Sequence, residues 1–310
     1  MKAPATTRRV GLAACLVSAV GFGVLPVLGK DAYDAGLGPL ALLWGRFGLA
    51  AVAFWFLVVF VVRPARPPSR AVVAALLMGS LGYAVEAGLF FAALERIDAS
   101  LVELLLYAYP ALVTAVALAW GREAPAPHLL GALALATLGV IGVFGGSLAS
   151  GVDPLGLVMG LGAAVVYAGY ILAGERVVAA VHPVLLAALV ATGATASFTL
   201  TGLVRGGLPS PRTSDGWGAV AVIAAVGTVV PMTALFFGIK RVGAPTASIV
   251  STFEPVVTVL LAVLLLGETL SLVEASGAAC VLLAVRLLAR RPDPPPPGDP
   301  QPLPESSMAG

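Results

Sequence analysis

Four charged residues lie inside long apolar segments of this sequence, where ionisable groups are rare. They are Arg46, Glu86, Glu103 and Glu254. A charge at the centre of a bilayer costs about 2.5–3.5 kcal/mol on insertion scales, so such residues usually bind ligands, relay protons or form ion pairs. A carboxylate can hold a cation or a proton, and an arginine can neutralise a carboxylate. We expect all four to act in substrate binding or coupling; for Glu254, which lies beside Pro255, a structural or gating role is the alternative.

Three of these charges are predicted at a similar depth. With a rise of 1.5 Å per helical residue, Arg46, Glu86 and Glu103 lie about 10, 12 and 9 Å from the outer ends of three successive helices. We predict that Arg46 pairs with Glu86 or Glu103, while the other carboxylate titrates. A purely structural ion pair is the alternative, since a buried Arg and carboxylate neutralise each other in a low-dielectric site.

Polar and aromatic residues share helical faces with these charges. Tyr83 lies three residues before Glu86, Tyr107 lies four after Glu103, and Ser251 lies three before Glu254. Tyr167 lies on a similar face of another apolar segment. These faces predict a cavity for an aromatic or cationic substrate, held by stacking and cation–π contact. Interhelical hydrogen bonding is the alternative use of the tyrosines.

Two prolines interrupt apolar segments at equivalent places. Pro110 and Pro255 each remove a backbone donor, and we expect them in the middle of helices. Twin hinges and static kinks are both compatible with this pattern.

The composition requires a membrane. Of 310 residues, 59% are hydrophobic and 11% charged, whereas roughly a quarter of an average soluble chain is charged. A net charge of +2 gives no reason to expect a nucleic-acid partner. Cys15 and Cys280 lie in apolar segments and form no metal or disulfide motif. We expect no cofactor, metal or catalytic residue, and a lipid bilayer as the main partner.

Ten segments have the length and polarity of membrane helices. We predict spans at residues 10–29, 39–62, 71–94, 97–119, 127–146, 154–174, 182–204, 216–238, 244–266 and 270–289. The fold class is therefore all-α, a membrane protein of ten helices. The remaining C-terminal residues, 291–310, form a proline-rich tail that we predict to be disordered.

Lys and Arg residues predict the orientation. If the N-terminus is cytoplasmic, twelve fall on inside loops and four on outside loops, an excess that follows the positive-inside rule. The inside set is Lys2, Arg8, Arg9, Arg63, Arg66, Arg70, Arg122, Arg176, Lys240, Arg241, Arg290 and Arg291; the outside set is Lys30, Arg96, Arg205 and Arg212. With ten spans, both termini are predicted to be cytoplasmic.

The sequence repeats itself at a spacing of 145 residues. The matched pairs include Gly82 with Gly227, Phe91 with Phe236, Arg96 with Arg241, Pro110 with Pro255, and Glu123 with Glu268. We divide the chain into repeats at 10–146 and 154–290. Five spans per repeat invert the second copy relative to the first. Inverted repeats are typical of secondary transporters, which bind substrate near the membrane midplane where the repeats meet.

These residues resemble the EamA type of the drug/metabolite transporter superfamily. The resemblance is carried by segment 244–257 (APTASIVSTFEPVV) with Gly267-Glu268, by Tyr109-Pro110 with Glu123, and by Arg46-Phe47. It implies ten spans in two EamA units, a plasma-membrane location and, usually, export of metabolites or amino acids. Glu86 and Glu103 depart from the general pattern and indicate a feature particular to this chain.

The predicted function is alternating-access transport of small metabolites, either amino acids or drug-like compounds, in the export direction. The absence of a Walker A motif leaves an ion gradient, exchange or facilitated flow as the driving force, with proton coupling through Glu86 or Glu103 as one option. A channel, a non-transporting scaffold and a membrane-embedded enzyme are the alternatives. The enzyme is disfavoured because the sequence has no HExxH or GxSxG motif.

Overall fold

The computed structural model describes residues 5–120, 127–242, 250–251 and 253–289, and every regular element among them is a helix. Glu123, residues 244–249 and the tail 291–310 lie outside this part. The first half comprises α1 (Ala5–Asp34), α2 (Pro39–Phe56), η1 (Leu57–Val62), α3 (Ser69–Leu77), η2 (Met78–Tyr83), α4 (Ala84–Leu94), α5 (Ala99–Leu106), α6 (Tyr109–Ala119) and α7 (Pro127–Ala149). The second comprises α8 (Pro154–Ala180), α9 (Pro183–Val204), α10 (Ser214–Ala224), η3 (Ala225–Val229), α11 (Val230–Val242), α13 (Glu254–Leu261), η4 (Ala262–Leu266) and α14 (Leu272–Ala289). The η elements are π-helical turns that continue the neighbouring α-helices.

Eight of the described helices are long and apolar enough to cross a membrane, so this is a multi-pass membrane protein. They correspond to the first eight predicted spans. The described part of the ninth, Glu254–Leu266, is shorter, and α14 has 18 residues. Large apolar side chains such as Val52, Phe60, Leu264 and Leu265 are more than 60% exposed, as expected for residues that face lipid.

The first helix extends further than predicted. Its apolar run stops near Gly29, but α1 continues to Asp34, and Gly36, two residues further on, adopts φ +84°. The Gly36 amide donates to the Tyr33 carbonyl and the Leu37 amide donates to the Ala32 carbonyl. This is a glycine-terminated helix end, and it shows that helix termination depends on backbone geometry rather than on loss of hydrophobicity.

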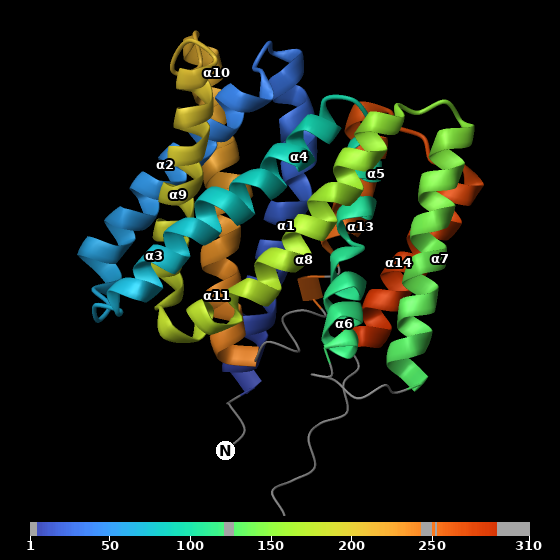
Figure 1. The fold of residues 1–310 in the computed structure, drawn as a ribbon, viewed down its shortest axis with the longest axis horizontal. Helices are drawn as coiled ribbons and strands as arrows, with labels where there is room; N and C mark the ends of the chain where they lie inside the picture. The colour runs from blue at the N-terminus through green and yellow to red at the C-terminus, as the bar shows by residue number, and fades with distance from the viewer. Residues whose placement is uncertain (1–4, 121–126, 243–249, 252, 290–310) are drawn as a thin grey trace, which may run out of the picture.

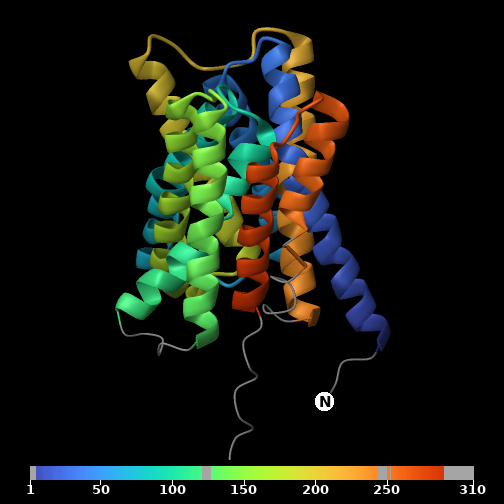
Figure 2. The ribbon, with the colours of Figure 1, turned by 90° about the vertical axis from the view of Figure 1, so that its right-hand side faces the viewer.

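The helices pack in pairs that cross between the two halves of the chain (Figures 1 and 2). α2 lies along α9, and α7 lies along α14. α1 packs on α11 and α13, while α8 packs on α4, α5 and α6. In Figure 1, α1 rises from the end marked N, whereas α8 descends towards that end.

Two glycines allow matching close approaches. A Cβ built on Gly82 would lie 2.7 Å from the Tyr170 ring, and one built on Gly227 would lie 2.7 Å from Leu25 Cδ1. Gly82 lies in the π-helical turn η2, and Gly227 lies in η3. Both the glycines and the side chains they meet are 145 residues apart in sequence, so this packing detail occurs in both halves.

Candidate functional site: a buried acidic and aromatic cavity

A cavity of about 180 Å³ lies between helices from both halves of the chain. All eight residues predicted to bind or couple substrate line it: Arg46, Tyr83, Glu86, Glu103, Tyr107, Tyr167, Ser251 and Glu254. The cavity is also lined by Phe22, Leu25, Pro26, Ala87, Phe90, Phe91, Leu106, Tyr109 and Leu235. The structure therefore gathers side chains from α1, α2, η2, α4, α5, α6, α8, α11 and α13 around one space.

Four pairs of lining residues are separated by 145 positions. They are Phe22 with Tyr167, Phe90 with Leu235, Leu106 with Ser251, and Tyr109 with Glu254. The members of each pair occupy equivalent places in the two repeats yet border the same cavity. Tyr109, for example, is the counterpart of Glu254 at the repeat spacing.

Arg46 is not ion-paired with either predicted partner. Within the described residues, no carboxylate oxygen lies within 4.0 Å of its guanidinium. Its Nε instead donates to Thr228 Oγ1 at 2.7 Å, and its Cζ lies 4.9 Å from the Phe47 ring centre and 5.5 Å from that of Phe91.

The prediction of an Arg46 ion pair was therefore wrong. Equal depth brings the charges to one level, but rotation of each helix decides which groups touch. A hydroxyl from η3 and two aromatic faces hold the arginine instead. It still lies near enough to Tyr83 and Glu86 for electrostatic interaction.

Glu86 and Glu103 are buried carboxyls that border the cavity. Their side chains are 7% and 5% exposed. Neither accepts a hydrogen bond from the residues that the structure describes. Glu103 lies within electrostatic range of both Glu86 and Glu254, so three acidic groups share the space with one arginine. Such a group of acids favours occupation by protons or by a cation.

Glu254 is held by a tyrosine from the opposite half of the chain. The Tyr107 hydroxyl lies 2.7 Å from Glu254 Oε2 and 2.8 Å from the Ser251 carbonyl oxygen. The next turn of α13 is anchored too, because the buried Thr258 hydroxyl donates to the Gly23 carbonyl at 2.8 Å. These contacts join α5 to α13 and α13 to α1.

Five tyrosines form a continuous aromatic wall. The ring centres of Tyr107 and Tyr109 are 6.0 Å apart, those of Tyr109 and Tyr167 are 4.7 Å apart, and those of Tyr167 and Tyr170 are 5.9 Å apart. Tyr170 continues the row to Tyr83 at 5.8 Å. Edge-to-face and stacked pairs of this kind stabilise one another and present π faces to a ligand.

The two prolines lie at helix starts rather than in mid-helix. α5 ends at Leu106, and Pro110 lies in the first turn of α6; Pro255 likewise lies in the first turn of α13. The expectation of prolines inside continuous helices was wrong, because a first-turn proline needs no intrahelical donor and begins a new segment instead. The breaks lie beside Tyr107 and Glu254, which line the cavity.

Two buried carboxylates outside the cavity, Glu268 and Glu274, each accept three hydrogen bonds. They lie near the start of α5, and we call this end of the helix bundle the rim. Glu268 Oε1 accepts from the Ala99 amide at 2.7 Å, and Oε2 accepts from the Ser100 amide at 3.1 Å and the Ser100 hydroxyl at 2.5 Å. It thereby caps the start of α5. Glu274 accepts from the hydroxyls of Ser147 and Ser271 and from the Ser271 amide.

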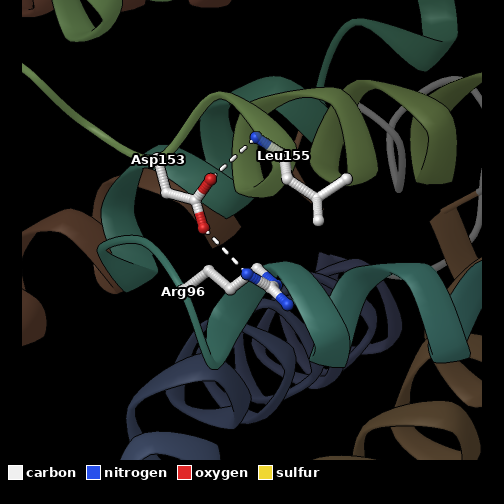
Figure 3. A network of polar contacts seen from close by, with 3 residues as sticks. All are labelled: Arg96, Asp153 and Leu155. Carbon is white, nitrogen blue, oxygen red and sulfur yellow. Dashed lines mark hydrogen bonds and ion pairs between the residues drawn. The ribbon is translucent and has the colours of Figure 1, made fainter.

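An exposed ion pair connects the end of α4 to the start of α8 at the same rim (Figure 3). Arg96 Nη1 lies 2.9 Å from Asp153 Oδ2, and Asp153 Oδ1 accepts from the Leu155 amide at 2.9 Å. Hydrogen bonds from Arg96 and from this backbone amide lower the pKa of Asp153. At Asp98, partial burial and the nearby Glu268 charge raise the pKa.

Sequence comparison places this architecture in a known family. The profile described as "EamA-like transporter family" matches residues 9–145 and again residues 154–290. The chain belongs to this family. A curated relative, "Uncharacterized transporter YcbK" of Bacillus subtilis (strain 168), is 30% identical over 286 residues, covering 87% of this chain and 89% of that protein. A solved structure titled "Crystal structure of protein" covers 93% of this EamA chain with a TM-score of 0.58 at 19% identity, which is similarity of fold.

Proposed function

We propose that this EamA protein is a secondary transporter that exports small metabolites, amino acids or drug-like compounds, across the plasma membrane by alternating access. The observation that carries the proposal is the buried cavity, which is bordered by equivalent residues of the two repeats. A substrate held at such a place can be exposed to either side by rocking one repeat against the other.

The proposal includes ten spans arranged as two inverted five-helix repeats. Its support is the reciprocal packing of α1 on α11 and α13 and of α8 on α4 and α5. The opposite directions of α1 and α8 in Figure 1 agree with inversion. The excess of Lys and Arg on the predicted inside loops supports a cytoplasmic location for both termini.

Movement requires places where the backbone can change direction. We assign this role to the breaks before Pro110 and Pro255, where α5 gives way to α6 and where α13 begins. The Tyr107–Glu254 hydrogen bond spans the two regions. Occupation of the cavity can therefore act directly on both hinges. Protons that bind Glu86 or Glu103 supply the coupling.

Export is tested by comparing metabolites in cells and medium for strains that lack or overproduce the protein. Overproduction should raise at least one extracellular solute and lower it inside, and deletion should do the reverse. Purified protein in liposomes should then move that solute, faster with a pH gradient than without. Unchanged solutes in both strains and in liposomes would refute the transporter proposal.

A further inference from the structure

The charges around the cavity are unbalanced. Three carboxyl groups and one guanidinium line it among the described residues. Arg46 is already engaged by Thr228 and by the faces of Phe47 and Phe91, and Glu86 is the carboxylate within its electrostatic range. The charges that act on Glu103 from the described residues are Glu254 and Glu86, which are both acidic. The surplus acid is therefore centred on Glu103 and Glu254.

Glu103 also lacks the donors that would make it a structural carboxylate. It is 95% buried, since 5% of its surface is exposed, and no described donor contacts it. Glu254 accepts from the Tyr107 hydroxyl, which is a neutral donor. An uncompensated buried carboxylate is strongly destabilising, so a proton or a positively charged ligand must occupy this place.

The aromatic wall stands next to these acids. Tyr109 borders the cavity beside Tyr107 on one side and Tyr167 on the other. Aromatic faces attract ammonium groups, and the attraction is stronger when both are removed from water. A volume of about 180 Å³ suits a ligand built on one ring, since an engineered cavity of roughly 150 Å³ holds benzene.

We propose that the transported compound is a small organic cation, an ammonium group joined to a flat apolar body. The ammonium lies between Glu103 and Glu254, and the flat body lies against Tyr109 and Tyr167. This inference rests on the proposed function, because it identifies the cavity as the transport site. An anion is disfavoured because it would meet three acidic groups. A zwitterion is also disfavoured, because its carboxylate would reach Arg46 only beside the acidic group of Glu86.

The test uses four probes of similar shape and different charge: 2-phenylethylamine, 2-phenylethanol, 3-phenylpropionate and phenylalanine. Binding to the purified full-length protein is measured by calorimetry near neutral pH. The amine should bind at least about tenfold more tightly than each of the others, a difference of 1.4 kcal/mol or more. Tighter binding of 3-phenylpropionate or phenylalanine, or no binding of the amine, would overturn the proposal.

Substitutions identify the groups responsible. Glu103→Gln should weaken amine binding at least about tenfold and leave 2-phenylethanol binding unchanged, because it removes charge but little volume. The matched control is Asp215→Asn at the exposed start of α10, which should bind all probes as the unmodified protein does. A cooperative thermal transition and intact 2-phenylethanol binding show that each variant is folded. Amine binding that survives Glu103→Gln would overturn the assignment.

The result separates this inference from the proposed function. Preferred binding of the acid or the zwitterion, with metabolite export intact, would refute the cation site and leave the transporter. Failure of export in both cells and liposomes, with selective amine binding intact, would refute transport and leave the cation site.

Discussion

Two sets of glutamates in this protein are buried to the same degree but differ in their donors. At the rim, Glu268 is 9% exposed and Glu274 is 5% exposed, and each accepts three hydrogen bonds. In the cavity, Glu86 and Glu103 are 7% and 5% exposed, and no described group donates to either.

Burial alone therefore does not identify a functional carboxylate. A buried acid that is surrounded by amides and hydroxyls stabilises the fold, whereas one that faces a cavity without donors is available to a ligand or a proton. Glu254 is intermediate, because its side-chain contacts are neutral hydroxyls: that of Tyr107, just after α5, donates to it, and that of Ser251 lies nearby. The following experiments test this distinction.

Glu268→Ala should produce the largest effect on stability. It leaves the Ala99 and Ser100 amides and the Ser100 hydroxyl without their acceptor at a buried helix start. We expect the free energy of unfolding to fall by about 3 kcal/mol. Each buried group left without a partner costs about 1–3 kcal/mol, and water can hydrate some of these three groups. Thermal unfolding in detergent measures the loss, and Asp215→Asn is the control. An unchanged melting temperature would remove the structural role assigned to the rim.

Glu103→Gln should show the opposite pattern. It removes an ionisable group that has no described donor, so we expect stability to be equal to that of the unmodified protein or higher by about 1 kcal/mol. Transport in liposomes should lose its response to an imposed pH gradient. Loss of stability comparable to that of Glu268→Ala would contradict the comparison between cavity and rim.

Tyr107→Phe tests the intermediate case. The substitution removes the hydroxyl that contacts Glu254 and the Ser251 carbonyl while keeping the aromatic ring. The expected loss is about 1 kcal/mol, the usual net contribution of a hydrogen bond. Combining it with Glu254→Gln gives a double-mutant cycle, in which coupled residues should lose less together than the sum of their separate losses. Strict additivity would show that the two helices are not coupled through this bond.

Much of this site could be predicted from the sequence because charges inside apolar helices are conspicuous. All eight predicted residues line the cavity, although they come from helices far apart in the chain. The hydropathy pattern places each of them at a depth, and substrate cavities lie near the midplane. The contacts that Glu268 makes with Ala99 and Ser100 carried no such signal in the sequence.

Helix rotation and helix breaks could not be predicted in the same way. The partner of Arg46 is a threonine in η3, and a single threonine in an apolar segment carries little signal. The prolines were visible, but an apolar run gives no indication that α5 stops at Leu106. These features depend on contacts between distant segments, which neither periodicity nor composition contains.

The smallest expected effects come from two aspartates at the rim, whose pKa values move in opposite directions. The hydrogen bonds from Arg96 and from the Leu155 amide lower the pKa of Asp153. Its carboxylate therefore stabilises the fold at pH values above the unfolded pKa of about 4. This contribution is lost as the pH falls through the lower pKa of the folded state. Burial and Glu268 raise the pKa of Asp98, so ionised Asp98 destabilises the fold until the pH falls through its higher folded value.

Asparagine at each position should therefore shift the melting temperature in opposite senses. At pH 7, Asp153→Asn should lower it slightly and Asp98→Asn should raise it slightly, because the first removes a favourable charge and the second an unfavourable one. Both differences should shrink as the pH approaches 3. Shifts of the same sign at pH 7 would contradict the opposite pKa directions assigned to Asp153 and Asp98.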